Sequence, residues 1–400
     1  MWYDHFSFLF DTRVVHITAT EKNLDSTPAY PKMVDYPSER SFLEEVGWGP
    51  YCHEFSRIDA GATPRVLWYL FLKKEILKQD KIDSNDIRQI LCADPIYARI
   101  GACFEQHQNQ LMKASTHESS GQCGWTPFYG GFVSLMQRMC AKPGYFIEFD
   151  WTRFDGTIPM KLFQHIKCMR FKLLNQKQRK RYRHVYNWYV YNLLNRYTLL
   201  PSGEVTIQNR GNPSGQISTT MDNNLINYWL QCFEFGFFFG CDKDLFETFD
   251  TIVYGDDRLT RFPYIPENYV DRVVAMYKDI FGMWVKPEKI KISQTPIGLT
   301  FCGFVIGEHF NPQPAQPFKL MAGLIKPSSV LPDLESLHGK LLSYQILLHY
   351  CDDEHPFKQY IEKCLAITSK LVGKKWPRRF TREQLEYLWR GGPKCHYGEG

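Results

Sequence analysis

Runs of apolar and polar residues predict a short-stranded core in the middle of the chain. Residues 145–150 (YFIEFD) alternate and end in an acid, which predicts a strand with Asp150 at its carboxyl end. Residues 251–254 (TIVY) are β-branched or aromatic, and Gly-Asp-Asp follows before residues 258–260 (RLT). That order predicts two strands joined by a tight turn. Residues 298–306 (GLTFCGFVI) form another candidate strand pair or hairpin.

Helical patterns flank this core. Residues 161 to about 199 have helical composition, and residues 216–237 predict a long helix with a polar first half and an apolar second half. Residues 267–281 place apolar side chains at helical spacing. After a Pro-rich segment at 311–317 the chain is helical again, and Thr381 with Gln384 matches a capping box. A domain boundary near 305–318 follows.

Composition is that of a large soluble protein with several subdomains. The 400 residues are 44% hydrophobic and 23% charged, both ordinary values. Twelve cysteines with no C-x-x-C pair indicate free thiols in a reducing compartment. The N-terminus has no secretory signal pattern, and the most apolar stretch, 232–241, is far shorter than the ~20 residues of a membrane span. Membrane association is therefore expected only through partners. A G-x4-G-K-[ST] motif is absent, which argues against a P-loop motor.

The net charge of +5 is unevenly placed. Residues 158–203 contain no Asp or Glu, ten Lys or Arg, and several aromatic residues. Such a segment is typical of a polyanion channel with stacking surfaces. The candidate nucleic-acid-binding residues are Arg179, Lys180, Arg181 and Arg183. A solvated helix face and a nuclear-import patch at 177–183 are the alternatives.

Four acids form a possible reaction centre. Asp155 follows Asp150 by five residues, and Asp256 and Asp257 lie in the tight turn. If the two strands are neighbours in one sheet, Asp150 and Asp256 come together. Oxygen ligands without nearby His or Cys suit Mg²⁺, and two such ions about 3.5–4 Å apart form the clamp used for displacement at phosphorus. Ordinary turn chemistry for Asp-Asp is the alternative.

The motifs as a set resemble those of positive-strand RNA virus RNA-dependent RNA polymerases. "DWTRFD" is similar to motif A, "SGQISTTMDN" to motif B and "YGDD" to motif C. Lys73, Glu75, Lys81 and Arg88 resemble the basic motif F, "KPEK" at 286–289 resembles motif D, and "FCGF" at 301–304 resembles motif E. These six motifs cover about residues 73–304 in family order. The wording around them, as far as "WRGGPK" at 389–394, is similar to the astrovirus members of the family.

The resemblance implies a role for each matched residue. Asp150 and Asp256 would be the principal metal ligands with Asp257 assisting, so that one ion activates the primer 3′-hydroxyl and the other holds the triphosphate. Residues expected to hydrogen-bond the ribose are Asp155, Ser214, Thr219 and Asn223. Lys81 and Arg88, supported by Lys73, would neutralise the triphosphate, unless they only form a solvated basic helix. Lys289 is the expected general acid, with Lys286 and Lys291 as alternatives.

Two of the motifs have structural alternatives. Ser214 could cap a helix, and Asn223 could satisfy buried backbone groups. The "FCGF" motif would be a hairpin that supports the primer strand, or it would be plain core.

The implied fold is α+β, a closed right hand with fingers, a palm built on a mixed or antiparallel sheet with helices, and a helical thumb. The implied ranges are 1–140 for the N-terminal segment and fingers, 141–160 for the palm with motif A, 161–203 for a basic fingers insertion, 204–305 for the palm with motifs B to E, and 306–400 for the thumb.

The implied activity is copying of viral RNA from nucleoside triphosphates with two Mg²⁺ ions, for which Mn²⁺ substitutes. A reverse transcriptase and an inactive RNA-binding scaffold are the rivals. The expected partners are template and product RNA, nucleoside triphosphates, a genome-linked protein primer and other viral replication proteins. The expected location is the host cytoplasm, in replication complexes held to membranes through partners.

Overall fold

The computed structural model describes residues 1–373 and 375–391, and it combines helices with two four-stranded sheets, a three-stranded sheet and a two-stranded sheet. Position 374 and positions 392–400 of the expected thumb range lie outside the described residues. Helices outside the sheet neighbourhoods discussed below are α1 Trp2–His5, α2 Glu39–Val46, α3 Gly49–Asp59, α4 Gln79–Asp83, α7 Phe154–Thr157 and α12 Lys243–Thr248. None of the described helices combines the length and apolar character that crossing a membrane requires.

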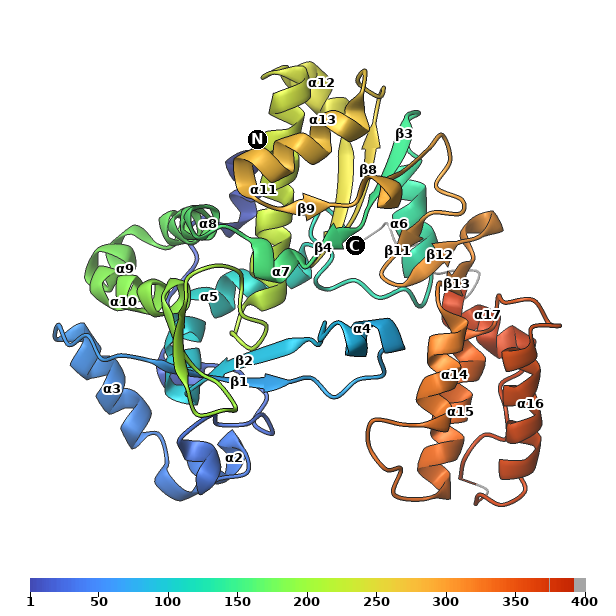
Figure 1. The fold of residues 1–400 in the computed structure, drawn as a ribbon, viewed down its shortest axis with the longest axis horizontal. Helices are drawn as coiled ribbons and strands as arrows, with labels where there is room; N and C mark the ends of the chain where they lie inside the picture. Colours follow the sequence, from blue (N-terminus) through green and yellow to red (C-terminus); the bar gives the residue numbers. More distant parts are fainter. Residues whose placement is uncertain (374, 392–400) are drawn as a thin grey trace.

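A four-stranded sheet in the order β10-β3-β8-β7 carries the predicted tight turn (Figure 1). Its strands are β3 Tyr145–Phe149, β7 Asp250–Tyr254, β8 Asp257–Phe262 and β10 Lys291–Ser293. β3 pairs antiparallel with β8, and Phe149 lies opposite Arg258. β7 also pairs antiparallel with β8, and Tyr254 lies opposite Asp257. Gly255 and Asp256 therefore form a two-residue turn, and the predicted strands are confirmed.

Helices cover both faces of this sheet. They are α6 Gly131–Met139, α11 Thr219–Phe239, and α13 Tyr269–Met276 followed by the π-helical turn Tyr277–Phe281. Phe146 of β3 and Ile252 of β7 pack with Phe132 of α6. Ile147, the next residue of β3, belongs instead to the core that contains Leu225 of α11. Because successive strand side chains point to opposite faces, β3 is buried on both.

The second sheet has the order β2-β1-β5-β6. Its strands are β1 Leu67–Leu72, β2 Gln89–Ala93, β5 Arg196–Leu199 and β6 Val205–Gln208. The helical segment predicted to about residue 199 ends earlier, because Tyr197 and Thr198 suit a strand and pair with both β1 and β6. The expected boundary at 204 thus separates two strands that are partners.

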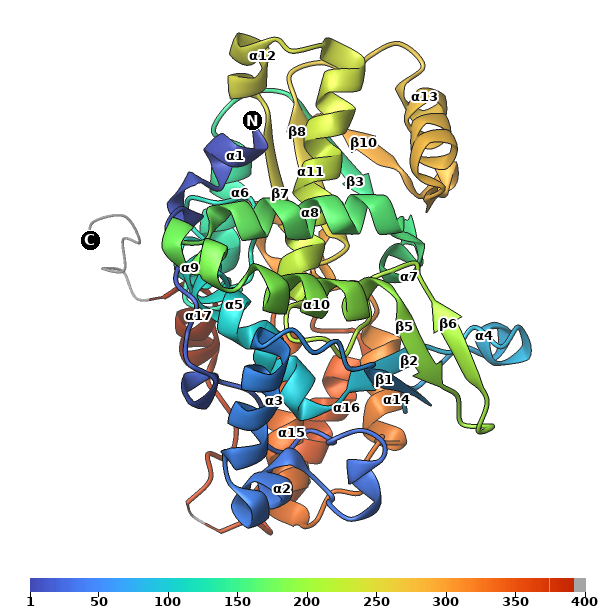
Figure 2. The same cartoon turned by 90° about the vertical axis from the view of Figure 1, so that its left-hand side faces the viewer.

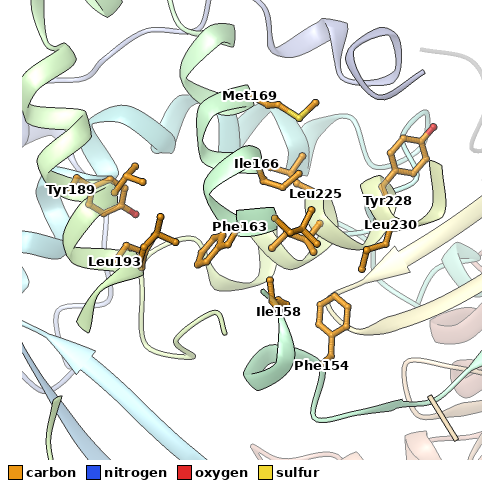
Figure 3. Packing of buried hydrophobic residues seen from close by; sticks show 14 of the residues in the cluster. Phe154, Ile158, Phe163, Ile166, Met169, Tyr189, Leu193, Leu225, Tyr228 and Leu230 are labelled. Atoms are coloured by element: carbon orange, nitrogen blue, oxygen red, sulfur yellow. The ribbon is translucent and has the colours of Figure 1, made fainter. Parts of the chain in front are cut away.

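The main core joins the helices that follow motif A to α11 (Figure 3). These helices are α8 Met160–Leu173, α9 Gln176–Arg181 and α10 Arg183–Leu194, and α5 Pro95–Ala114 packs with them. Phe163 and Ile166 of α8 lie between Leu225 of α11 and Leu193 of α10. Figure 2 shows α8 and α10 side by side on the outside of the molecule.

Part of the acid-free basic segment is buried, contrary to the channel interpretation. Lys167 and Arg170 are 0% and 1% exposed and form ion pairs with Glu105 of α5 and Asp222 of α11. Arg196 is also buried and donates to the backbone carbonyl of Gly211 at 3.2 Å. Buried charges of this kind require partners from other segments, which a count along one segment does not show.

The C-terminal part is a small sheet followed by helices, as predicted. The elements are β11 Thr300–Phe301, β12 Phe304–Ile306, β13 Pro312–Pro314, α14 Pro317–Ile325, α15 Leu334–Leu347, α16 Pro356–Thr368 and α17 Arg382–Arg390. β11 and β12 form the predicted hairpin, and Thr381 and Gln384 form the predicted capping box. α15 and α16 share an apolar core, whereas α17 returns to α6, where Gly130 donates to the carbonyl of Trp389 at 2.8 Å.

Candidate functional site

The sheet register brings the predicted acids together. Phe149 of β3 is paired with Arg258 of β8. Because the two strands are antiparallel, Asp150, the residue after Phe149, lies opposite Asp257, the residue before Arg258. Asp256 is the second residue of the turn. The expected meeting of Asp150 with the turn is confirmed, and it occurs through β8 rather than β7. Asp150, Asp256 and Asp257 all have solvent-exposed side chains.

Two amide side chains of helix α11 hold the backbone of the turn. The Asn224 Oδ1 atom accepts from the Gly255 backbone N–H at 2.5 Å. The Asn227 Nδ2 group donates to the carbonyl oxygens of Gly255 at 3.1 Å and Asp256 at 3.3 Å. Gly255 has φ +65°, and a Cβ there would meet no atom within 4 Å. The turn therefore requires glycine for its backbone conformation and not for space.

The protein and the acids around Asp257 raise its pKa. The pKa of Asp257 is raised to about 7. The largest cause is the surrounding protein, which displaces water from the carboxyl group, and the charges of Asp256, Glu148 and Asp150 add to it. The Cys302 backbone N–H donates to Asp257 and partly offsets this rise. Because the carboxylates repel one another, a cation bound between them would be electrostatically favourable.

Asp155 lies in the same field and is held by motif B. Asn223 Nδ2 donates to Asp155 Oδ1 at 2.6 Å, and Asn212 Nδ2 donates to Asn223 Oδ1 at 2.8 Å. Burial and then the charge of Asp256 raise the pKa of Asp155 to about 6, while Asn223 and Arg88 act in the opposite direction. Asn223 therefore links α11 to motif A. Both of these bonds join side chains, which differs from the alternative expectation that Asn223 satisfies buried backbone groups.

The two hydroxyl residues of motif B are bonded to backbone. Ser214 Oγ donates to the Gln89 carbonyl of β2 at 3.2 Å. Thr219, the first residue of α11, donates to the Pro213 carbonyl at 2.9 Å. The N-cap of α11 is Ser218, so Ser214 does not cap this helix. Ser214 and Thr219 instead fix the loop that precedes α11.

Lys289 is the motif D lysine that faces the acids. Its Nζ atom lies 3.6 Å from Asp150 Oδ2, and both side chains are about half exposed. Lys291 Nζ lies 3.5 Å from Glu148 Oε1 on the neighbouring strand. This geometry favours Lys289 over Lys291 for contact with a group bound at Asp150.

The motif F cations are exposed, and two of them form separate, long ion pairs. Arg88 Nε lies 3.5 Å from Glu75 Oε1, and Lys81 Nζ lies 3.7 Å from Asp86 Oδ2. Asp86 also accepts from Arg153 of motif A at 2.9 Å. The Lys73 backbone N–H donates to the Arg88 carbonyl at 2.9 Å, so these two residues extend the β1-β2 pairing. Of these cations, Arg88 acts on an acid of the site, because its positive charge lowers the pKa of Asp155 and so offsets part of the rise.

The motif E hairpin is tied to the acids and is more than core. Besides the Cys302 bond to Asp257, Thr300 donates to Glu148 from its backbone N–H at 2.8 Å and from its hydroxyl at 2.6 Å. These bonds bind β11 to β3 beside Asp150.

The four basic candidates of the segment 158–203 lie elsewhere. Arg179, Lys180 and Arg181 are on α9 and Arg183 begins α10, at the outer end of the molecule and away from the turn (Figure 1). Arg181 forms an ion pair with Asp59, with 2.5 Å between Nη2 and Oδ2. The structure thus separates these residues from the acids, and their role stays a prediction.

Sequence reasoning missed the residues that support the site. Asn224 and Asn227 hold the turn, while Arg258 and Glu234, both fully buried, form an ion pair of 3.0 Å under the sheet. The Arg258 guanidinium also lies over the Phe149 ring, 4.1 Å from its centre, directly beside Asp150. Repeated amides and a Glu inside an otherwise apolar helix were the available signal, because buried polar groups require partners.

The donor set suits a hard cation, although it is not a closed cage. No group of three His, Cys, Asp or Glu side chains within residues 1–373 and 375–391 is arranged to hold a metal ion. Mg²⁺ usually takes one or two carboxylates and completes its shell with water and substrate phosphates. Three exposed carboxylates close together, with the pKa of Asp257 raised by the surrounding protein and by its neighbours, fit that mode of binding.

Comparison with known proteins agrees with this geometry. The profile of the viral RNA-dependent RNA polymerase family matches residues 48–348. The non-structural polyprotein 1AB of human astrovirus-5 is 61% identical over 98% of this chain, and those of ovine astrovirus 1 and turkey astrovirus 1 are 51% identical over 98% and 44% identical over 91%. The chain spans 28%, 30% and 23% of these polyproteins, respectively.

A solved structure shows the same fold. The sicinivirus 3Dpol RNA-dependent RNA polymerase superposes with a TM-score of 0.75 at 17% identity, covering 97% of this chain and 83% of that one. The α+β right-hand fold expected from the sequence is confirmed. The chain belongs to the viral RNA-dependent RNA polymerase family.

Proposed function

We propose that this chain copies viral genomic RNA, joining nucleoside triphosphates to an RNA 3′-hydroxyl and releasing pyrophosphate. The observation that carries the proposal is the meeting of two strands from distant segments, which sets Asp150 beside Asp256 and Asp257. The family membership supports the same activity. The Asp155–Asn223 pair and the cations of motif F support a nucleotide as the second substrate.

Each residue of the site has a task in this proposal. Two Mg²⁺ ions, or Mn²⁺ in their place, held by Asp150, Asp256 and Asp257 would activate the 3′-hydroxyl and neutralise the triphosphate. Lys289, 3.6 Å from Asp150, donates a proton to the leaving pyrophosphate. Arg88, with Lys81 and Lys73 further along the motif F segment, attracts the triphosphate to the site.

Choice of ribose over deoxyribose rests on the Asp155–Asn223 pair. Their 2.6 Å hydrogen bond fixes both side chains, and a 2′-hydroxyl can enter this network as donor and acceptor. A deoxynucleotide has no 2′-hydroxyl to join this network, so it lacks the hydrogen bonds that a ribonucleotide gains in this partly buried site. This pair argues against the reverse-transcriptase alternative, and Ser214 and Thr219 support it by fixing the preceding loop.

Replacing Asp256 tests the activity. Asp256→Asn keeps the shape of the turn and should abolish Mg²⁺-dependent extension of a primed RNA, while the unfolding midpoint stays unchanged. Asp271→Asn, an exposed acid at the start of α13, is the matched control and should retain activity. Full activity in Asp256→Asn would overturn the mechanism. An inactive wild-type chain in the same assay would favour the scaffold alternative.

The wider setting is part of the same proposal. RNA template, RNA product and nucleoside triphosphates are its substrates, and a genome-linked protein primer and other viral replication proteins are its proposed partners. The proposed location is the host cytoplasm, in replication complexes that reach membranes through those partners. Co-sedimentation of the chain with membranes only when the other viral proteins are present tests this location.

A further inference from the structure

A large groove lies on the outer side of the molecule, between α8, α9 and α10. It has a volume of about 1110 Å³, and its wall is completed by Tyr3 and Phe10 from the N-terminal segment. The lining residues are Tyr3, Phe10, Met160, Gln164, Cys168, Phe171, Lys172, Arg179, Lys180, Arg183, Tyr186, Asn187, Val190, Tyr191, Leu194 and Asn195. Figure 2 shows these helices on the face turned to the viewer, and Figure 1 shows them on the left, apart from β3 and β8.

The charge of the groove has one sign. Four of its lining residues are Lys or Arg, and none is Asp or Glu. The nearby acids are already engaged: Asp4 pairs with the N-terminal amine, Asp11 accepts from Asn175, and Asp59 pairs with Arg181. Among the described residues, Lys172, Lys180 and Arg183 form no ion pair, so their charges remain available to a ligand.

Aromatic rings supply much of the remaining wall. Phe10 and Tyr191 are 55% and 52% exposed, which is unusual for such large side chains. Tyr3 stacks on Phe10 with ring centres 6.5 Å apart, and Phe171 stacks on Tyr186 at 4.7 Å. Cations along a groove together with exposed ring faces are the combination that binds single-stranded nucleic acid without sequence preference.

We propose that this groove binds a few nucleotides of single-stranded RNA outside the catalytic site. Lys172, Lys180 and Arg183 contact phosphates, Arg179 contributes from the groove wall, and Tyr191 and Phe10 stack on bases. Arg181 is left out, because its guanidinium is held by Asp59 outside the groove lining. The proposal rests on the proposed function insofar as the RNA is the polymerase's own template or product strand.

An RNA hairpin with a 5′ overhang of a few templating nucleotides, made with and without a long single-stranded tail beyond that overhang, separates the groove from the catalytic site. The tail-less hairpin keeps the templating overhang and is extended at the catalytic site. The increase in affinity caused by the tail is then assigned to the outer groove through variants of the groove lining. Fluorescence anisotropy with the full chain gives this increase at several salt concentrations. Extension of the tail-less hairpin is followed in the same samples.

The charge variant is Lys180→Ala with Arg183→Ala, and its control is Lys177→Ala with Arg181→Ala. Both double variants remove two positive charges from the α9–α10 segment, but the control positions do not line the groove. The first should lose most of the tail's contribution and lower the slope of log affinity against log salt by about 1.4. The control should keep both, and all variants should extend the tail-less hairpin normally.

The stacking variant is Tyr191→Ala, with Tyr191→Phe as the conservative rescue. Tyr191→Ala should weaken tail binding about fivefold or more, and Tyr191→Phe should restore it, because a ring face is sufficient for stacking. An unchanged tail contribution in the charge variant would overturn the proposal. So would an equal loss on the tail-less hairpin.

An acidic protein segment is the other ligand that such a groove could hold. Labelled poly-glutamate that binds the wild type but not Lys180→Ala with Arg183→Ala, together with no contribution from the RNA tail, would overturn the RNA proposal in favour of it. Failure of the wild type to extend the tail-less hairpin would instead count against the proposed function, so the two failures are distinguishable.

Discussion

Two groups of carboxylates lie on different sides of α11 and are treated in opposite ways. Glu105 and Asp222 are fully buried, and Asp222 receives Lys167 Nζ at 2.6 Å and Arg170 at 2.8 Å. Although burial alone raises the pKa of Asp222, these two cations hold it below its ordinary value. Asp150, Asp256 and Asp257 are exposed residues. The pKa of Asp257 is nevertheless raised to about 7, because the surrounding protein displaces water from its carboxyl group and because its neighbours are negatively charged.

The two groups differ in how many of their carboxylates are paired with a cation. In the buried group every carboxylate is matched by a cation of the same chain, which stabilises the junction of α5, α8 and α11. Within residues 1–373 and 375–391, the one ion pair to Asp150, Asp256 or Asp257 is the long one between Lys289 and Asp150. Negative charge that the described residues leave unmatched is available to a cation that arrives with the substrate.

Neutralising an exposed acid should have the largest effect, and it should appear in activity alone. Asp150→Asn should lower nucleotide incorporation by about a hundredfold or more, because it removes a ligand on which the reacting groups depend. Its thermal unfolding midpoint should stay equal or rise, since repulsion with Asp257 is relieved. Primed extension and thermal unfolding measure the two effects. A clear loss of stability would show that Asp150 is a structural acid.

Neutralising a buried acid should reverse the pattern. Asp222→Asn leaves Lys167 and Arg170 with one carboxylate, and the cost should be about 3–5 kcal/mol in the free energy of unfolding. Urea denaturation measures it. Glu54→Gln is the matched control, because Glu54 forms an ion pair with Arg57 on the surface, where a loss below about 1 kcal/mol is expected. Equal costs for the two changes would contradict the comparison.

Asn223→Ala tests the carboxylate that lies between the two groups. Loss of the amide releases Asp155 and should reduce the preference for NTP over dNTP by about tenfold or more, since the polar partner of the 2′-hydroxyl is lost. Competing incorporation of NTP and dNTP on one template measures it. Asn209→Ala, at an exposed position in the loop before α11, should leave the preference unchanged.

The turn itself should give the smallest effect. Gly255→Ala places a side chain at φ +65° and should cost about 1–2 kcal/mol of stability, with no clash to add to it. Gly339→Ala, inside α15 and also free of close neighbours, should instead stabilise by about 0.5–1 kcal/mol. Urea denaturation of both variants separates backbone strain from the added methyl group.

The sequence was sufficient for the strands, the turn and the long helix, because these depend on local pattern and on the residues of the motifs. Asp150, Asp256 and Asp257 could be brought together on paper because one strand ends in an acid and another begins after a turn. The role of each site residue, and the division of the chain into fingers, palm and thumb, are still proposals.

What could not be read from the sequence depends on contacts between distant segments. Nothing local distinguishes Lys167, which is buried against Glu105, from Lys180, which is exposed in the outer groove. Likewise, residues 196–199 continue a helical composition, but pairing with β1 makes them a strand. Asn224 and Asn227 could be recognised only as unusual amides, because their partners lie about thirty residues away.

The amide face of α11 has a mechanical consequence. Asn223 contacts Asp155, for which the proposed function gives the role of testing the sugar. Asn224 and Asn227, within about one helical turn, hold the backbone of the turn that carries Asp256. The contacts with Asp155 and with the turn therefore come from the same helix, α11. If the proposed function holds, a sugar that fits badly against Asn223 would displace the same helix that positions Asp256, so an error in substrate choice would also misalign the reacting groups.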